Sequence, residues 1–263
     1  MTPSSIVRLE VTNGLAIVTL AQPERNNPFD GDFVRAIKSV FLQLWETPDL
    51  RCVLIRADGA NFSFGGDIKS FYPQRDRLAS IVREWTAELH VGLQRAWQLP
   101  VPIVAEVQGF AMGGGVALFA GADFVIAGQS TKIGSAFAHI GFSCDSGTSV
   151  VLTARMGAAR AKRFVMLGDI MSSEQAQHAG LVDRVVSDES LSAEALALAQ
   201  KLANGPTVAY GQIKRLFQRA SAIAIESQLE DEAMTLARVA ATHDAQEGIA
   251  AMAEKRKPKF LGR

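Results

Sequence analysis

Apolar and polar residues alternate over residues 7–12 of the chain. Val7, Leu9 and Val11 are apolar and the residues between them are polar, so one face of this segment can be buried. Asn13-Gly14 follows, and a second apolar run occupies residues 15–20. Asn-Gly suits a two-residue hairpin turn, because both central residues of that turn need a positive φ. The pattern predicts a β-hairpin.

Apolar residues recur at helical spacing in two longer stretches. The first stretch predicts a helix over about residues 30–45, and the second predicts one over about residues 76–98. Pro100 and Pro102 follow the second stretch and end it, because proline cannot continue a helix.

Short apolar runs at residues 52–55, 103–107 and 123–126 predict buried strands. Glycine-rich turns follow the first two runs, and helical patterns come after the turns. A recurrence of strand, turn and helix is typical of an α/β fold. From about residue 190 the chain becomes Ala-, Lys- and Glu-rich helix without a convincing strand. We therefore expect a core over residues 1–200 and a helical region over residues 201–263.

Composition excludes several classes of protein. The chain has 263 residues, 48% of them hydrophobic, with 27 basic and 27 acidic side chains. A core of this size needs no disulfides or structural metal, and Cys52 and Cys144 alone form neither a disulfide framework nor a zinc site. Zero net charge provides no overall field for nucleic acid or membrane lipid. The first residues lack a signal-peptide pattern. We expect a cytoplasmic protein without a metal, nucleic-acid or membrane partner.

The glycine-rich turns over residues 61–67 and 109–115 are candidate anion sites. The first N–H groups of a helix have no intrahelical acceptor, and glycine leaves them uncovered. Such an end suits a phosphate, a carboxylate or a developing oxyanion. The chain lacks G-x-x-x-x-G-K-[ST], and residues 109–115 are not a G-x-G-x-x-G turn, so a nucleotide phosphate is disfavoured. The glycines can alternatively serve only close helix–strand packing.

Three segments resemble one known family. Residues 62–68, FSFGGDI, resemble the F-x-x-G-x-D-[IL] loop of the crotonase (enoyl-CoA hydratase/isomerase) superfamily. Residues 102–115, PIVAEVQGFAMGGG, resemble its P-V-I-A-A-V-N-G-x-A-x-G-G-G segment, and residues 254–263, EKRKPKFLGR, resemble its E-K-R-x-P-x-F-x-G tail. The likeness spans essentially the whole chain.

The resemblance implies a spiral of ββα units and a C-terminal helical region for trimerisation, as a homotrimer or a dimer of trimers. It implies an acyl-CoA substrate, with no cofactor beyond the coenzyme A of that substrate. The backbone N–H groups of Phe64 and Gly114 would form an oxyanion hole for a thioester enolate. Lys257 and Phe260 would contact CoA, from this or a neighbouring subunit, unless they form an ordinary solvated tail. The other implied substrate contacts are Asn61, Phe62, Ser63, Gly65, Gly66, Asp67, Ile68, Gly113 and Phe137.

The two glutamates of the family's hydratases are absent. Ala117 and Phe137 stand at their positions, and neither side chain can move a proton. Residues 138–147, AHIGFSCDSG, resemble the stretch in which isomerases of the superfamily carry one acidic residue, and Asp145 falls at that position. The resemblance implies that Asp145 shuttles a proton between C2 and C4 of an enoyl-CoA. Without it, the residue pattern favours Asp145 as the cap of a helix starting at about Ser146.

Other interpretations remain open at this stage. His90 and Asp145 together resemble the catalytic pair of an aryl-CoA dehalogenase in the superfamily, where the aspartate attacks the ring and the histidine activates water. The chain can also be a non-catalytic acyl-CoA-binding protein. Glu106 replaces a usual alanine and is a candidate substitute for a missing glutamate. The sequence favours Δ3,Δ2-enoyl-CoA or ring-type isomerisation, in fatty acid metabolism or aromatic acid degradation.

Overall fold

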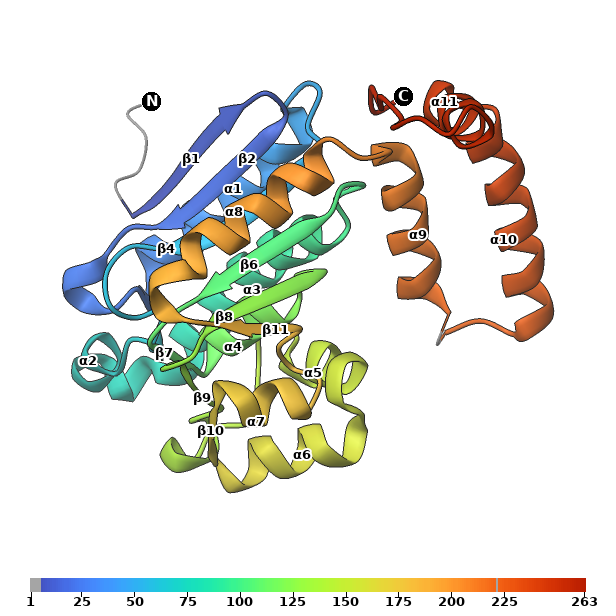
Figure 1. Ribbon diagram of the computed structural model, residues 1–263. Coiled ribbons are helices and arrows are strands. Elements are labelled where there is room, and N and C mark those ends of the chain that lie inside the picture. The colour runs from blue at the N-terminus through green and yellow to red at the C-terminus, as the bar shows by residue number, and fades with distance from the viewer. Residues whose placement is uncertain (1–5, 221) are drawn as a thin grey trace.

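A six-stranded sheet with the order β1-β2-β4-β6-β8-β11 organises the chain (Figure 1). The structure is a computed structural model and describes residues 6–220 and 222–263. The strands are β1 (Val7–Thr12), β2 (Leu15–Leu20), β4 (Cys52–Ala57), β6 (Ile103–Val107), β8 (Phe124–Gly128) and β11 (Arg184–Val186). β1 and β2 are antiparallel and every later neighbour is parallel. The predicted buried strands are confirmed, and they are mostly apolar because helices cover both faces of the sheet.

The turn between β1 and β2 confirms the predicted hairpin. Asn13 has φ 51° and Gly14 has φ 78°, as this turn requires. A side chain at Gly14 would approach the carbonyl oxygen of Asp49 to 2.7 Å, so glycine also permits close packing here.

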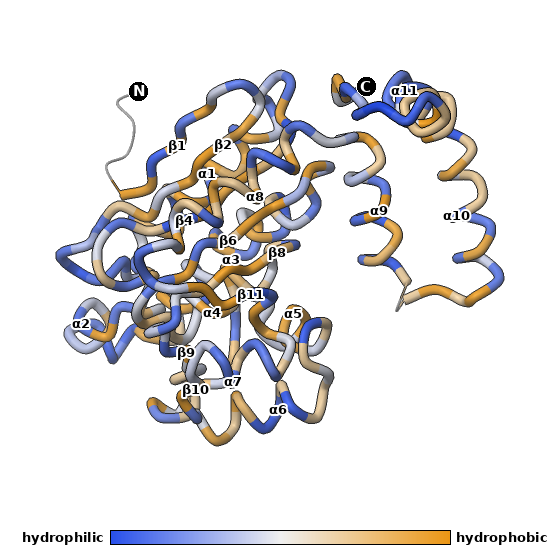
Figure 2. Tube along the Cα trace, in the orientation of Figure 1, coloured by the Kyte–Doolittle hydropathy of each residue, from blue (hydrophilic) through white to orange (hydrophobic). Residues whose placement is uncertain are grey.

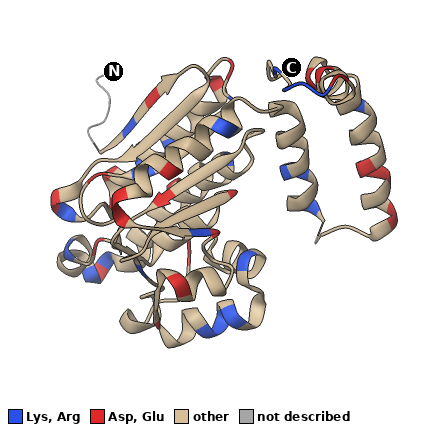
Figure 3. Cartoon of the chain, viewed as in Figure 1, with Lys and Arg blue, Asp and Glu red and all other residues tan. Residues whose placement is uncertain are grey.

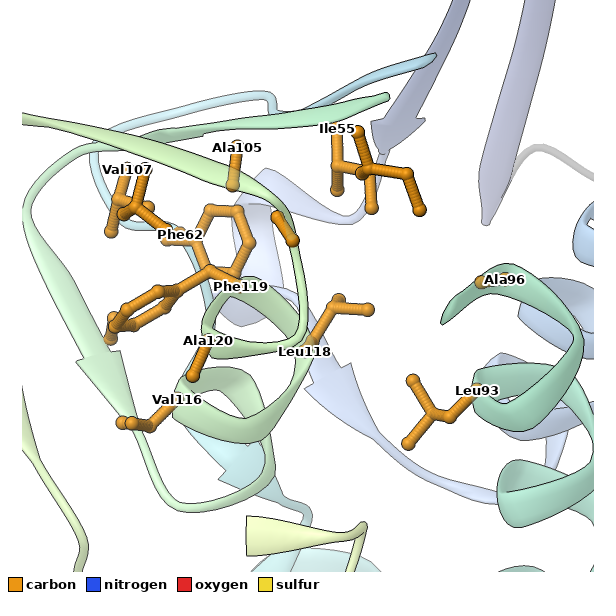
Figure 4. Packing of buried hydrophobic residues seen from close by; sticks show 14 of the residues in the cluster. Ile55, Phe62, Leu93, Ala96, Ala105, Val107, Val116, Leu118, Phe119 and Ala120 are labelled. Carbon is orange, nitrogen blue, oxygen red and sulfur yellow. The ribbon is translucent and has the colours of Figure 1, made fainter. Parts of the chain in front are cut away.

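Helices divide the interior into two apolar cores, one on each face of the sheet. α8 (Leu191–Ala203) covers the face nearer the viewer in Figure 1. α1 (Gly31–Glu46), α3 (Leu78–Trp97) and α4 (Gly114–Ala120) cover the other face. Figure 4 shows this second core, where the rings of Phe62 and Phe119 meet edge to face at 6.0 Å. Figure 2 shows hydrophobic residues concentrated along the central strands.

Both long helices lie close to their predicted ranges. α1 begins after Asp30, whose carboxylate accepts a hydrogen bond from the Phe33 N–H at 2.9 Å and caps the helix. α3 begins at Leu78, two residues later than predicted, because a 3-10 segment (Tyr72–Arg77) with a non-helical Gln74 precedes it.

Pairs of strands followed by a helix repeat along the chain and wind it into a spiral. In the units that begin at β2, β4, β6 and β8, the first strand joins the large sheet and the next strand joins a smaller one. The smaller sheets pair β3 (Pro28–Phe29) with β5 (Gly65–Gly66), and order β10 (Ile170–Ser172), β9 (Lys132–Gly134) and β7 (Phe110–Met112). A parallel bridge between Ser63 and Ala111 links the two. The α/β spiral implied by the sequence is therefore confirmed.

Shorter helices complete the core. They are α2 (Ile68–Phe71), α5 (Thr148–Met156), α6 (Ala158–Leu167) and α7 (Ser173–His178), with further 3-10 turns at Pro23–Arg25, Ala138–Ile140 and Asp188–Ser190. Within the described residues, no helix combines the length and apolar character needed to cross a membrane.

Three C-terminal helices extend away from the sheet (Figure 1). They are α9 (Thr207–Arg219), α10 (Ile225–Ala240) and α11 (His243–Ala253). α8 crosses residue 200 and packs on the sheet, so the chain leaves the core only after α8. Large apolar side chains lie exposed on these helices, including Phe217 (79%) and Met252 (83%). Figure 3 shows charges of both signs along the same helices. Trimerisation through this region stays a prediction.

An ion pair anchors α9 to the sheet. The Lys214 ammonium lies 2.9 Å from a carboxylate oxygen of Asp123 and also donates to the carbonyl oxygen of Val101 at 3.2 Å. The same Asp123 oxygen accepts the N–H of Ile103, the first residue of β6. Asp123 therefore has a structural role.

We expect Lys214→Met to lower the free energy of unfolding by about 2 kcal/mol, between the values for exposed and buried pairs. Lys214 is only 7% exposed, so its loss leaves Asp123 without its cation in a partly dry site. Urea unfolding measures the change, with the exposed Lys201→Met on α8 as control. Equal midpoints for the two variants would contradict the anchoring role.

Candidate active site

An apolar cavity lies between α2, α3, the first turn of α4 and the loop that precedes α5. It has a volume of about 150 Å³. Among its described lining residues, Asp145 is the only one with an ionisable side chain. The lining residues are Phe29, Val34, Phe64, Gly66, Ile68, Phe71, Val82, Trp85, Thr86, Leu89, Gly113, Gly114, Ser135, Ala136, Phe137, Ile140, Phe142, Asp145 and Ser146.

Two backbone segments meet at one end of this cavity. Gly65 has φ 72°, and a side chain there would lie 2.7 Å from the Met112 carbonyl oxygen and 3.0 Å from the Gly114 nitrogen. Only glycine allows so close an approach in this backbone conformation. Gly114 opens α4, and N–H groups of a first helical turn have no intrahelical acceptor. Donors from two segments can therefore reach one point.

The structure corrects the predicted role of Phe64. Its backbone N–H donates to the carbonyl oxygen of Asn26 at 3.1 Å, so this donor is already used. In the parallel pairing of β3 with β5, Phe29 lies opposite Gly66 and accepts the N–H of Asp67 at 3.1 Å. That pattern turns the N–H of Gly66 away from β3. Gly66, which lines the cavity, is therefore the donor that the geometry favours beside Gly114.

Asp145 is half-buried and does not cap a helix. α5 begins at Thr148, after Gly147, and no side chain caps it. The Asp145 carboxylate instead accepts a hydrogen bond from the Ser146 hydroxyl, with 3.0 Å between Oγ and Oδ1. Burial raises the pKa of Asp145, and the hydrogen bond from the Ser146 hydroxyl opposes part of that rise. A raised pKa moves this carboxyl toward the range useful for proton transfer near neutral pH.

His90 comes to the same place from α3. Its Nε2 accepts the backbone N–H of Ser146 at 3.1 Å. A backbone N–H can only donate, so Nε2 carries no proton and the neutral ring has its proton on Nδ1. The structure therefore brings His90 and Asp145 together at Ser146, although His90 does not line the cavity.

The positions of the missing glutamates offer no replacement. Ala117 is fully buried inside α4, and Phe137 forms part of the cavity wall. Side chains alternate between the two faces of the sheet along β6. Ala105 and Val107 belong to the core on the cavity side, whereas Val104 belongs to the core beneath α8. Glu106 therefore lies on the α8 side of the sheet, with Val104. Burial raises the pKa of Glu106. The sheet separates Glu106 from the cavity, so it does not substitute for a catalytic glutamate there.

Several predicted substrate contacts shape the loop instead. Phe62 and Ser63 are fully buried and cannot touch a ligand, which corrects that prediction. Phe62 packs in the core (Figure 4), and the Ser63 hydroxyl donates to the Asn27 carbonyl oxygen at 2.7 Å. Asp67 caps α2 and pairs with Arg25 at 2.6 Å. Asn61 accepts the Phe110 N–H at 2.9 Å, which joins this loop to β7.

The other predicted positions divide between the cavity and the tail. Gly113, Phe137 and Ile68 line the cavity, and Phe64 contributes its exposed ring to the lining. Lys257 and Phe260 lie in the C-terminal tail, where the Phe260 ring packs against Gly248 of α11. Neither residue lines the cavity, and contact with CoA from a neighbouring subunit stays a prediction.

Many lining residues of the cavity lie outside the sequence prediction, and Trp85, Phe71 and Ser146 are examples. Trp85 belongs to an apolar helical stripe that is equally typical of a core, and Phe71 and Ser146 carry no signal in one sequence. The described residues hold no cluster of side chains suited to a metal ion. Cys144, next to Asp145, is a half-buried free thiol.

Comparisons with known proteins agree with this architecture. The family model for enoyl-CoA hydratase/isomerase matches residues 10–263. The chain is 32% identical to the 1,2-epoxyphenylacetyl-CoA isomerase of Escherichia coli, covering 96% of this chain and 97% of that protein. It is 30% identical to a probable enoyl-CoA hydratase of Rhodobacter capsulatus, with 98% of each covered.

Solved structures with a similar fold come from the same family. A crystal structure of a putative enoyl-CoA hydratase/isomerase from Mycobacterium abscessus superposes with a TM-score of 0.91 at 33% identity, covering 98% of this chain and 100% of that one. Relatives thus carry both hydratase and isomerase names. The matched family model, the curated relatives and the shared spiral together show that the chain belongs to the enoyl-CoA hydratase/isomerase family.

Proposed function

We propose that this enzyme moves a carbon–carbon double bond in an acyl-CoA thioester, with Asp145 as the proton carrier. One observation carries the proposal: Asp145 is the only ionisable side chain among the described residues that line the cavity. Gly66 and Gly114 both line this cavity, and their backbone N–H groups would bind the thioester oxygen. A single base and two donors are what this isomerisation needs.

The reaction balances without water or a redox partner. The Asp145 carboxylate removes a proton from C2 of a 3-enoyl thioester, and the electron pair spreads over C2, C4 and the thioester oxygen. The two N–H groups stabilise this dienolate as its charge develops. Asp145 then returns the proton to C4, which leaves the conjugated 2-enoyl product and the carboxylate in its starting state.

The geometry gives the alternatives less support. Hydration uses two carboxylates, and Ala117 and Phe137 stand at those positions. A dehalogenase would use His90 as the base that activates water, yet its Nε2 already accepts the Ser146 N–H. A non-catalytic acyl-CoA-binding role predicts that Asp145 has no chemical effect, which the mutation below tests.

We further propose that the acyl group is compact, with a ring or short chain. The Phe71 ring lies 5.2 Å from Trp85 and 6.3 Å from Phe142, so aromatic side chains form the cavity wall. An apolar cavity of about 150 Å³ can hold a guest the size of benzene. The name of the relative from Escherichia coli, an isomerase of epoxyphenylacetyl-CoA, is consistent with this size class.

Asp145→Asn should reduce kcat for 3-enoyl-CoA by about 10²–10⁴-fold, because the amide has nearly the same shape but cannot take a proton. The ultraviolet absorbance of the conjugated product measures turnover. Asp32→Asn is the matched control, since Asp32 is exposed on the surface of α1. Turnover by the wild type that Asp145→Asn leaves intact would refute the assigned base.

The same substitution should change stability in a pH-dependent way. The raised pKa means that the ionised carboxylate is less favourable in the folded chain than in the unfolded one. Asp145→Asn should therefore raise Tm at pH 7, and the gain should disappear as pH falls below the unfolded-state pKa of about 3.9. Calorimetry across pH checks this. A variant less stable than wild type at pH 7 would contradict the burial cost.

The size of the acyl group can be tested by binding. Phenylacetyl-CoA should bind about tenfold or more tightly than dodecanoyl-CoA, because a guest larger than the cavity must displace its walls. Phe142→Ala should reduce this preference, whereas Phe217→Ala on exposed α9 should not. Calorimetric titration gives both affinities. A preference of the wild type for the long chain would overturn the compact-acyl proposal.

A further inference from the structure

Ser146 adopts a backbone conformation that serine rarely takes. Its φ is 54° and the next residue, Gly147, has φ 73°, so the chain makes two successive left-handed steps before α5. Gly147 is required there, because a side chain would approach the Trp97 ring to 2.5 Å. Ser146 carries a side chain, and a residue other than glycine is strained at a positive φ. A residue held in this way needs partners that hold it.

Asp145 and His90 are the hydrogen-bond partners of Ser146. Its hydroxyl donates to Oδ1 of Asp145 at 3.0 Å, and its backbone N–H donates to Nε2 of His90 at 3.1 Å. Ser146 is only 1% exposed, so water cannot replace either bond readily. Its Oγ also lies 3.5 Å from the point where Gly114 would carry a Cβ. The hydroxyl therefore sits between the carboxylate and the first turn of α4.

We infer that Ser146 and His90 are positioning residues that hold one oxygen of the Asp145 carboxylate and leave the other to carry the proton. His90 holds the left-handed backbone of Ser146, and the Ser146 hydroxyl holds Oδ1. Oδ2 then remains for the substrate. The inferred consequence for turnover rests on the proposed function, whereas the arrangement of the carboxylate itself does not.

The surroundings of Asp145 contain few other charges. His90 on α3 and Cys144, the preceding residue, are the neighbouring ionisable side chains. The cavity-lining residues of α2, α3, α4 and the 3-10 turn before Phe142 carry none. The arrangement needs His90 Nε2 as the acceptor for the Ser146 N–H. Removal of the Ser146 hydroxyl should raise the pKa of Asp145, because the hydroxyl donates to the ionised form.

Ser146→Gly separates positioning from folding. Glycine accepts a positive φ without strain, so the variant should fold with at least the thermal stability of the wild type. The matched control is Ser143→Gly, because Ser143 is exposed on the same loop. Carbon-13 NMR of labelled aspartate carboxyl groups, with the Asp145 signal assigned from Asp145→Asn, follows the titration of Asp145 directly.

We expect Ser146→Gly to shift the Asp145 titration, and the acid limb of the kcat profile, to higher pH. We expect kcat to fall about tenfold or more with little change in KM, because substrate binding is kept while the base loses its orientation. Ser143→Gly should change none of these. An unshifted Asp145 titration in a folded Ser146→Gly variant would overturn the inference.

His90 is tested by a pair of variants. The side-chain oxygen of His90→Gln can accept the Ser146 N–H, whereas His90→Leu offers no acceptor. His90→Gln should therefore lose less activity than His90→Leu, and its Asp145 titration should stay closer to that of the wild type. Equal effects of the two variants on the titration would refute the role given to His90. Absence of turnover in the wild type would refute the proposed function alone, since the NMR titration still decides the positioning.

Discussion

The approach of the Gly65–Gly66 segment to the first turn of α4 is the contact on which the site depends. It requires glycine at Gly65, because any side chain would collide with the Met112 carbonyl oxygen and the Gly114 nitrogen. The Met112 N–H donates to the Ser63 carbonyl oxygen at 2.8 Å, which holds the two segments in register. The buried Phe62 anchors the loop in the core below. Gly66 and Gly114, on the two sides of this contact, both line the apolar cavity, and Asp145 is the only carboxylate among the described lining residues.

That arrangement has a physical cost as well as a chemical use. Burial raises the pKa of Asp145, so the ionised carboxylate has a higher free energy in the folded chain than in the solvent-exposed, unfolded chain. The same dry surroundings strengthen the attraction between backbone N–H groups and a developing enolate. The described lining residues include one acid, Asp145, and this is the ground on which we propose a reaction that returns its proton to the substrate. The strained backbone at Ser146 likewise costs stability, and in return the Ser146 hydroxyl is held against the Asp145 carboxylate.

The sequence pattern predicted those parts of the fold that depend on interactions between residues close together in the chain. The Asn13–Gly14 turn, the apolar strands and the two long helices follow from alternation, turn chemistry and helical period. The proposed oxyanion donor could not be identified in this way. The N–H groups of residues 64–66 look equivalent in the sequence, and only the structure shows that those of Phe64 and Gly65 already donate to Asn26 and Ser63. Ser146 and His90 lie 56 residues apart, so only the tertiary fold reveals their bond. The stripe that contains Trp85 likewise cannot distinguish a core from a cavity wall.

In the proposed mechanism, Asp145 and the two backbone donors together form and stabilise a thioester enolate. Exchange of the α-protons of phenylacetyl-CoA in D₂O measures this most directly, because it requires the base and the donors but no double bond in the correct place. We expect the wild-type enzyme to accelerate this exchange, and we expect that Asp145→Asn still binds the thioester but does not accelerate it. Binding without exchange by the wild type, or equal exchange by both proteins, would contradict this mechanism.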